Sequence, residues 1–507
     1  MKRIFTFLLL IFSFVSFSQN KYQVERLPSR IRLSGEIVRM QGEQDLGFLG
    51  HGYEMFGLIP KAPKWYFGVN SYSALTGIRS GLFVFGVTAG IQKPIIKDWL
   101  YYDAGLFLGG GGGSGAPDGG GLMVRPHLDL EAFVSKNISL RAGLSLVDFP
   151  SGAINSFNLN VGATIKTNTY LANNINSTEK GNGITFFNMI EISALSMNLM
   201  NYKKGPLKTD VVVDKDAPNI SLLGALLKSG HHHNFYGVLK LGGAFIGEVD
   251  GFMMLLSGVG YELPITNWLS IDAKGLVGGA GGGNVQFGGG FATQIEAGVG
   301  LRFSDYLFNV SYGNTYAPNG NFESNHIDIS LGKRFKLYKN PDINSIELVE
   351  SDKIKKEEFS FSTYNRAYFS GNKKDKGGRV YDDVFNSIGF ELEKKLNNHI
   401  SIIGATVWAY QGNYGAYAEG WLGLQYYHPI STSWSLTAKG LFGAGGGGSI
   451  NLGSGMIYQY NIGLEKQINK RWSFVLNTGQ VRAVTGNFTP FLLDVGIKLN
   501  ISQLVKN

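Results

Sequence analysis

The chain has 507 residues, no cysteine and a formal net charge of +8 at pH 7. The lack of cysteine excludes disulfides, thiolate metal sites and a cysteine-linked lipid anchor. Charged residues make up only 17%, whereas glycine (71), phenylalanine (34) and tyrosine (24) are abundant. A disordered chain would show the opposite balance, rich in charge and poor in aromatic residues.

The first residues predict a secretory signal peptide over 1–18. A basic MKR start precedes an apolar run, Ile4 to Phe17, and Ser16 and Ser18 are the small residues of a cleavage site. We expect cleavage near Ser18–Gln19, because the run is too short for a membrane-spanning helix. No later apolar run approaches 18 residues, so membrane insertion would have to use strands. An exported chain with scattered charge is not expected to bind nucleic acid.

Three glycine runs show that the chain is a threefold repeat. AGLFLGGGGG at 104–113, AKGLVGGAGGG at 273–283 and AKGLFGAGGGG at 438–448 are about 170 residues apart. Each follows a proline turn that ends in a tryptophan. A repeat period of this kind determines the architecture before local propensities do. We expect β-barrel repeats over 29–167, 183–337 and 357–502.

Within each repeat, apolar and polar residues alternate with period two. In the first repeat, Ile138, Leu140 and Leu144 alternate with Ser139 and Arg141. Stretches of about ten such residues are typical of transmembrane β-strands. A soluble sandwich can also alternate, but its polar face would carry more lysine and glutamate. The predicted fold is all-β: an antiparallel up-and-down transmembrane β-barrel with about eight strands per repeat.

Connections of alternating length support this prediction. In the second repeat, short turns at 228–234, 263–268 and 303–306 alternate with long loops such as 203–216 and 314–325. Outer-membrane barrels have short periplasmic turns and long outer loops. Aromatic residues beside the turns are predicted interfacial anchors, namely Trp99, Trp268, Trp434 and Trp472.

This pattern resembles the outer-membrane β-barrel proteins of Gram-negative bacteria over essentially the whole mature length, without the motif of a specific family. The resemblance implies an outer-membrane location. It also implies outer-membrane lipid and the insertion machinery as partners, with an extracellular or envelope protein as a further candidate.

The sequence leaves two ways to close the sheet. Three times eight strands could form one barrel of about 24 strands or three small barrels in tandem. A large barrel would leave a wide hole unless plugged, and the chain has no plug-sized segment outside the repeats. Polar segments at about 167–183 and 337–357 separate the repeats. Inward glycines also suit a narrow interior, so three small barrels are favoured.

Few residues suggest chemistry, and no cofactor is expected. The glycine runs lack the following Gly-Lys-Ser/Thr and helix of a phosphate-binding loop, so we interpret them as structural elements of a barrel rim. His231, His232 and His233 are a weak metal candidate in one turn, which the sister turns do not repeat. The weak catalytic candidates His326, Asp328 and Ser330 share one strand face, but residues i and i+4 lie about 13 Å apart.

A polar row on one strand face is predicted to fill the barrel interior. The row comprises Arg125, His127, Asp129 and Glu131, and the aligned positions in the other repeats are Gln294, Glu296, Gln459 and Asn461. Buried charges need mutual pairing. The sharper alternative is a proton or ion path through the barrel.

The leading functional hypothesis is a non-enzymatic outer-membrane protein with a structural or surface-interaction role. A porin-like passive channel or transporter is the first alternative, and a lipid-modifying barrel enzyme is the second.

Overall fold

The computed structural model describes residues 22–506 except 78, 80, 175–187, 203–205, 208–214, 217–218, 248, 250, 284, 289, 340–353 and 383. The predicted signal peptide therefore lies outside the described residues. Regular structure in the described part is antiparallel β-sheet. No helix in this part is long and apolar enough to cross a membrane.

The first repeat closes into an eight-stranded barrel, called barrel 1. Its last strand pairs with its first, for example at Ile31↔Ile165, and every other strand pairs with its neighbour in sequence. The strands are β1 (Tyr22–Val38), β2 (Leu46–Phe56), β3 (Trp65–Thr76), β4 (Phe83–Ile96), β5 (Leu100–Gly112), β6 (Met123–Phe133), β7 (Ile138–Asp148) and β8 (Asn155–Asn174).

The second repeat closes in the same way into barrel 2, through the pairing of β9 with β18. Its strands are β9 (Asn188–Tyr202), β12 (Ile220–His232), β13 (Phe235–Ile246), β14 (Met253–Pro264), β15 (Leu269–Gly281), β16 (Phe291–Phe303), β17 (Tyr306–Tyr316) and β18 (Glu323–Lys339). A small hairpin, β10 (Pro206–Leu207) and β11 (Lys215–Asp216), lies in the loop after β9.

The third repeat forms barrel 3, closed by the pairing of β19 with β26. Its strands are β19 (Ile354–Phe369), β20 (Val384–Lys395), β21 (Ile400–Gln411), β22 (Ala418–Pro429), β23 (Trp434–Gly446), β24 (Met456–Gln467), β25 (Trp472–Ala483) and β26 (Phe491–Lys506). The prediction of three small barrels is confirmed, and a single pair, Leu337↔Val505, links the sheets of barrels 2 and 3. The first and last strands of barrels 1 and 3 extend beyond the predicted 29–167 and 357–502, whereas the strands of barrel 2 span 188–339 against the predicted 183–337.

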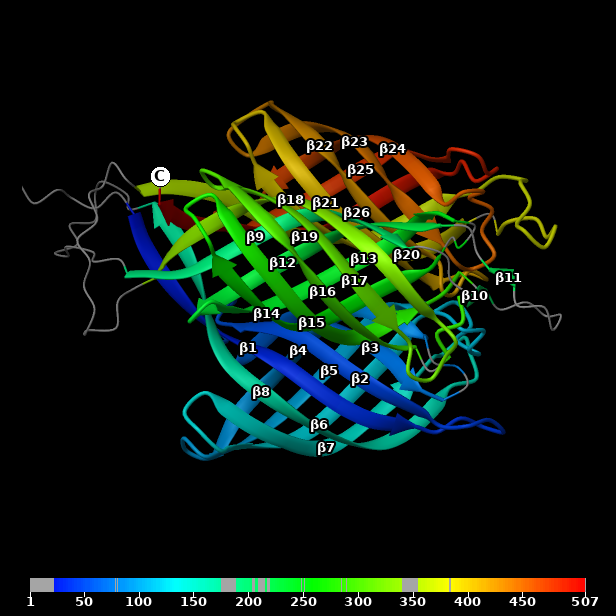
Figure 1. The fold of residues 1–507 in the computed structure, drawn as a ribbon, viewed down its shortest axis with the longest axis horizontal. Coiled ribbons are helices and arrows are strands. Elements are labelled where there is room, and N and C mark those ends of the chain that lie inside the picture. The colour runs from blue at the N-terminus through cyan, green and yellow to red at the C-terminus, as the bar shows by residue number, and fades with distance from the viewer. Residues whose placement is uncertain are drawn as a thin grey trace, which may run out of the picture.

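Each barrel has a turn end and a loop end. The short turns and both ends of every repeat lie at the turn end, and the long connections lie at the loop end (Figure 1). Trp99, Trp268 and Trp434 are exposed at the turn end, as interfacial anchors require. Trp472 differs from them, because it packs with Leu499 of barrel 3 and Leu27 of barrel 1.

The outer face of the barrels is apolar and the inner face is polar. On β6, the outward Leu128 is 56% exposed, whereas the neighbouring inward Asp129 is 1% exposed. Outward Leu159 and Ile295 are 77% and 72% exposed. Large apolar side chains at such exposure need an apolar solvent, and the hydrocarbon core of a bilayer supplies one.

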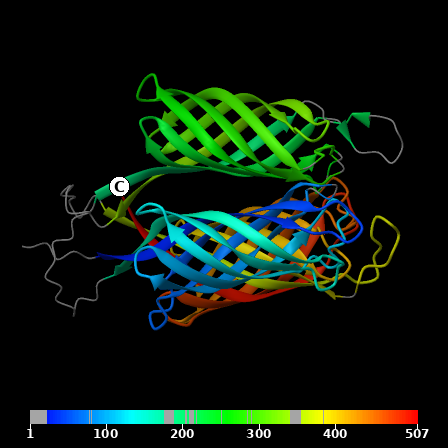
Figure 2. The same ribbon diagram turned by 90° about the horizontal axis from the view of Figure 1, so that it is seen from below.

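The three barrels lie side by side with their loop ends together (Figures 1 and 2). Near the loop end their outward faces share one apolar cluster. Phe83 and Phe85 of barrel 1 contact Trp408 of barrel 3, and Met253 of barrel 2 packs against the cluster.

The glycine runs form the seams between the barrels. The run of barrel 1 packs on the 412–417 loop of barrel 3, where the Ala416 N–H donates to the Gly111 carbonyl at 3.2 Å. The run of barrel 2 packs on Gly81 of barrel 1, and Gly251 of barrel 2 packs on the run of barrel 3. Each run therefore meets the loop between the third and fourth strands of another barrel. The three contacts close into a ring with pseudo-threefold symmetry.

Close backbone approach explains why these positions are glycine. A β-carbon on Gly110 would lie 2.6 Å from the Trp408 carbonyl oxygen, and one on Gly281 would lie 2.9 Å from the Gly81 Cα. A β-carbon on Gly251 would lie 2.8 Å from the Gly447 nitrogen. No real side chain fits at these distances, so any other residue would push the barrels apart.

We predict that Gly281→Leu opens the seam between barrels 1 and 2 without unfolding either barrel, because Gly281 meets only Gly81 of the other barrel. The chain has no native cysteine, so an engineered pair reports the seam. Ser73→Cys with Gly279→Cys suits a disulfide, since the two β-carbons would be 3.6 Å apart. Oxidation should cross-link the parent pair, seen as a mobility shift on a non-reducing gel, and Gly281→Leu should abolish the cross-link.

The matched control is Gly275→Leu, on the same strand and outward face but with nothing within 4 Å of its β-carbon. It should leave the cross-link intact. Equal cross-linking in both leucine variants would contradict the role of Gly281 in holding barrels 1 and 2 together.

A buried carboxyl makes the seam between barrels 1 and 3 sensitive to pH. Asp118 lies in the loop after β5, and its carboxylate accepts a hydrogen bond from the Gly113 N–H at 3.0 Å. A β-carbon on Gly415 of barrel 3 would lie 2.7 Å from this carboxyl group. Burial raises the pKa of Asp118 from 3.8 to about 6. The folded protein thus favours the protonated carboxyl, and stability decreases as pH rises from 3.8 to about 6.

We predict that Asp118→Asn raises the free energy of unfolding at pH 7.5 by up to about 3 kcal/mol, because the amide stays neutral. At pH 3.5 the variant and the parent should be equally stable, since Asp118 is then protonated in both states. Urea unfolding at the two pH values measures the difference. An equal gain at both values would show that ionisation of Asp118 is not the cause.

Candidate functional site

The candidate site is the interior of the barrels, which side chains fill in two layers. An apolar cap lies toward the loop end of each barrel, and a network of ion pairs lies toward the turn end. Inward residues of both layers are almost fully buried. Eight strands enclose a space just wide enough for such filling.

The network of barrel 1 is built on arginine. Arg30 pairs with Asp103 at 2.6 Å, while Arg32 and Arg141 both pair with Asp129 at 2.6 Å. Alternation along β1 places the two N-terminal arginines on the inner face, and β5 and β6 present the acids across the bore. These guanidinium groups are therefore paired with carboxylates inside the bore.

The predicted polar row of β6 lies inside this network. Arg125 pairs with Glu36 at 2.6 Å, and His127 Nε2 lies 2.9 Å from Asp103 Oδ1. Glu131 accepts a hydrogen bond from Gln92 Nε2 at 2.6 Å.

Barrel 2 uses lysine for the same purpose. Lys240 pairs with Glu296 and, at 2.6 Å, with Asp328; Lys274 pairs with Asp272 at 2.6 Å. The predicted residue Gln294 donates from Nε2 to the Tyr202 hydroxyl at 3.0 Å. The other predicted residue, Glu296, belongs to the same ion-pair network through Lys240.

Barrel 3 has a third version of the network. Arg366 pairs with Asp494 at 2.7 Å and Glu419 at 3.2 Å, and donates to the predicted residue Gln459 at 2.7 Å. Nearer the turn end, Lys498 pairs with Glu393 at 2.7 Å. The other predicted residue, Asn461, is buried beside this network.

Glycines on the inner face make room for these side chains. A β-carbon on Gly313 would lie 2.8 Å from the Glu296 side chain and 2.9 Å from the His326 ring. On Gly143 it would lie 2.3 Å from the Asp129 carboxylate. Small inward residues are thus part of the packing of the network.

Among the described residues, one group could hold a metal ion, namely Asp103, His127 and Asp129, whose ligand atoms lie within 4.8 Å of one another. Both carboxylates already pair with guanidinium groups, at 2.6 Å from Arg30, Arg32 or Arg141. A divalent cation would have to bind among these positive charges. We therefore assign the three residues to the ion-pair network.

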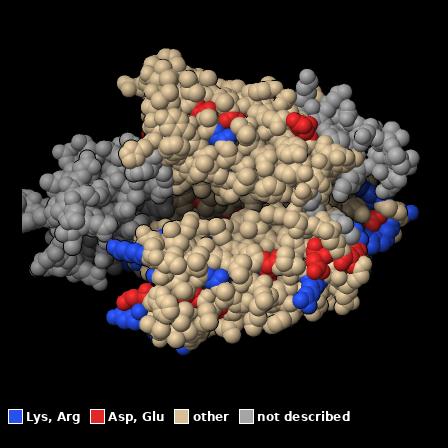
Figure 3. Space-filling model, turned by 60° about the horizontal axis from the view of Figure 1, so that its bottom comes forward, with Lys and Arg blue, Asp and Glu red and all other residues tan. Residues whose placement is uncertain are grey.

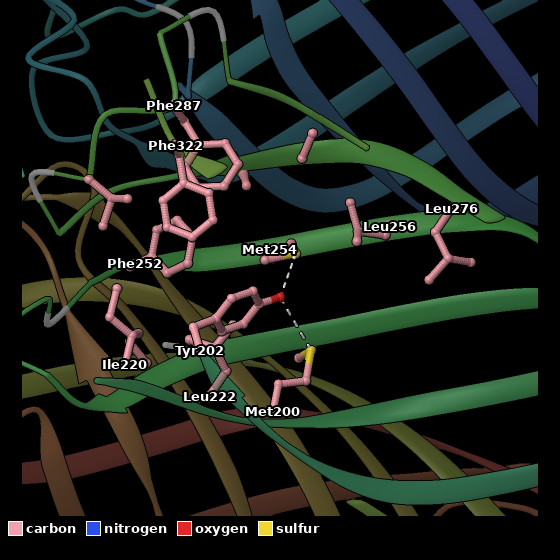
Figure 4. Packing of buried hydrophobic residues seen from close by; sticks show 14 of the residues in the cluster. Met200, Tyr202, Ile220, Leu222, Phe252, Met254, Leu256, Leu276, Phe287 and Phe322 are labelled. Carbon is pink, nitrogen blue, oxygen red and sulfur yellow. Dashed lines mark hydrogen bonds between the residues drawn. The ribbon is translucent and has the colours of Figure 1, made fainter. Parts of the chain in front are cut away.

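The apolar caps close the loop end of each bore. In barrel 2, Phe287 and Phe322 stack with ring centroids 4.4 Å apart, and Phe252 packs beside them (Figure 4). The Tyr202 hydroxyl lies 3.8 Å from the Met200 sulfur and 3.7 Å from the Met254 sulfur (Figure 4). Barrels 1 and 3 carry equivalent clusters around Phe107 and Phe488. The caps separate the ion pairs from the loop end.

The weak catalytic candidates all point into barrel 2, where each has a different partner. His326 Nε2 lies 2.9 Å from Glu296 Oε1, Asp328 pairs with Lys240, and the Ser330 hydroxyl accepts from Asn309 Nδ2 at 3.2 Å. The three side chains are 2–3% exposed. This arrangement gives a serine nucleophile neither a base nor access to a substrate.

The metal candidates of the histidine turn lie mostly outside the described residues. The side chains of His231 and His232 lie outside the described residues. His233 is exposed in the tight turn between β12 and β13 with a backbone φ of 48°.

Sequence reasoning missed the seam residues. The runs were interpreted as rim elements, and their partner loops were not identified. A signal was present, because these loops repeat a glycine pair: Gly77 and Gly81, Gly247 and Gly251, Gly412 and Gly415.

Comparison with known proteins gives structural similarity only. No protein-family model matches the chain, and no curated protein matches it. Among solved structures, it is similar to the siderophore receptor PirA from Pseudomonas aeruginosa, with 9% identity, a TM-score of 0.27 and coverage of 94% of this chain and 80% of that chain. It is also similar to Pseudomonas aeruginosa OpdQ, with 10% identity, a TM-score of 0.19 and coverage of 95% of this chain and 98% of that chain. For Acinetobacter baumannii OccAB4 the identity is 8%, the TM-score is 0.21, and the coverage is 96% of this chain and 99% of that chain.

TM-scores this low do not establish a common arrangement of strands, so function has to be argued from the barrels themselves. Closed antiparallel barrels with apolar outer and polar inner faces define a transmembrane β-barrel protein of the outer-membrane type. Its distinguishing feature is three filled barrels in one chain.

We predict that Arg366→Met destabilises barrel 3 by about 3–5 kcal/mol, because Asp494 and Glu419 would remain buried without a cation. Urea unfolding in detergent micelles, followed by loss of the heat-modifiable gel band, measures the change. The control is Arg379→Met in an outer loop of the same barrel, where the side chain is 50% exposed. It should cost less than about 1 kcal/mol. Equal costs would contradict a structural role for the network.

Proposed function

We propose that this protein is a non-enzymatic outer-membrane protein that anchors one composite outer surface through three filled barrels. It is exported by a cleaved signal peptide, and its turn end faces the periplasm. The three loop ends, joined by the glycine seams, form the outer surface. Its partner would be an extracellular or envelope protein.

The filling of the barrel interiors carries this proposal. In each barrel the apolar cap and the ion pairs occupy successive levels of the bore. A passive channel needs a continuous water-filled path, whereas the described inward side chains are almost fully buried. Acids and bases pair within each barrel, which favours packing over a conducting path.

The arrangement of the loop ends supports a role in surface interaction. Three seams hold the barrels in a fixed relation, so that their outer loops can act as one surface. The inward position of His326 and Ser330 supports the absence of a lipid-hydrolysing site.

Single-channel recording in planar lipid bilayers tests the proposal. We expect no conductance steps of porin size, because each bore is filled along its length. The Ser73→Cys/Gly279→Cys disulfide should be formed in the same sample, which shows that a silent bilayer contains folded protein. Regular porin-sized steps from cross-linked protein would overturn the proposal in favour of a channel or transporter.

A further inference from the structure

The turn end of barrel 1 carries a basic patch. The patch consists of five exposed lysines, Lys61, Lys64, Lys97, Lys136 and Lys166. None of them forms an ion pair with another described residue. The corresponding turns of barrel 2, residues 233–234, 265–268 and 304–305, contain no lysine or arginine. Figure 3 shows the contrast: blue, with some red beside it, lies at the left end of the lower barrel, whereas the same end of the upper barrel is tan.

The patch lies at the level of the aromatic belt. Lys64 precedes Trp65, which is 45% exposed, and Lys97 lies two residues before Trp99. Lys166 Nζ lies 3.4 Å from the centroid of the Phe133 ring. Aromatic residues of this kind mark the headgroup region of a bilayer. Lysines at this level reach lipid phosphates with their ammonium groups while their stems lie along the barrel wall.

The loop end has a different pattern of charge. Its basic residues are often paired, as in Arg79 with Glu43 and Arg379 with Asp375. Unpaired lysines at the belt are thus a property of the turn end of barrel 1, since Lys394 and Lys395 at the turn end of barrel 3 pair with Glu357 and Glu358. A surface with uncompensated lysines attracts anionic lipid.

From this placement we propose that the basic patch of barrel 1 binds the phosphate-bearing headgroups of anionic phospholipids in the leaflet that contacts the turn end. The neighbouring outward face of the barrel holds the acyl chains. The patch selects lipid by charge, so barrel 1 is surrounded by anionic lipid on one side of the membrane only.

The test uses the full-length protein in phosphatidylcholine vesicles with a trace of spin-labelled phosphatidylglycerol or spin-labelled phosphatidylcholine. The parent should prefer the phosphatidylglycerol label, and added sodium chloride should weaken the preference. The variant K61Q/K64Q/K97Q/K136Q should lose it, by about fivefold for each lysine that contacts a headgroup. Lys166 is left unchanged because it packs on Phe133.

The control variant R39Q/K373Q/K374Q/R482Q removes the same charge from exposed positions at the loop end. It should keep the preference of the parent. Retention of the preference in the turn-end variant, or an equal loss in the control, would overturn the proposal. A loss that sodium phosphate causes and sodium chloride of equal ionic strength does not would also overturn it, by identifying free phosphate as the ligand. The cysteine pair across the seam verifies folding in each variant.

Discussion

Closure of each sheet after eight strands is the constraint on which the rest of the structure depends. In a bilayer every backbone N–H and C=O must be paired within the protein, so each repeat must join its last strand to its first. Eight strands then set a bore that side chains can fill and that solvent cannot occupy freely. The buried ion pairs, the apolar caps and the inward glycines are all consequences of this narrow bore. A single sheet of 24 strands would have demanded none of them.

The barrels are narrow, round and apolar outside, so a further interaction is needed to hold them against one another in the membrane. Lipid competes equally well for an apolar surface, so hydrophobicity alone does not hold two barrels together. Close backbone contact stabilises the association of two barrels further, because it adds van der Waals contact and, at Gly111, a hydrogen bond between barrels. The glycine runs supply this contact at three equivalent places. Barrels 1 and 3, which are farthest apart in sequence, also meet at the turn end around Leu499 and Trp472.

The sequence was sufficient to predict the strands and their faces. A strand that separates lipid from a polar interior alternates apolar and polar residues with period two, and this alternation is visible in the sequence. It also predicted that the row Arg125 to Glu131 faces inward. It could not predict the partners of that row, since Arg30, Arg32 and Glu36 come from β1, about 100 residues away, and their pairing depends on closure. The seams were missed for a similar reason. A glycine shows that something approaches closely, but not what approaches.

The three repeats differ most where the structure tolerates difference. Position 125 of barrel 1 is arginine, and the aligned positions 294 and 459 are glutamine, yet all three side chains are buried in a complementary network. Many combinations of charge and hydrogen bonding can fill a bore, as long as each barrel satisfies its own groups. At Gly110, Gly251 and Gly281 the seam accepts only glycine, because a β-carbon there does not fit between the two backbones. The side chains that fill the bores differ between repeats because each bore is packed independently. The glycine runs are alike in all three repeats because the three seams must fit one another to close the ring.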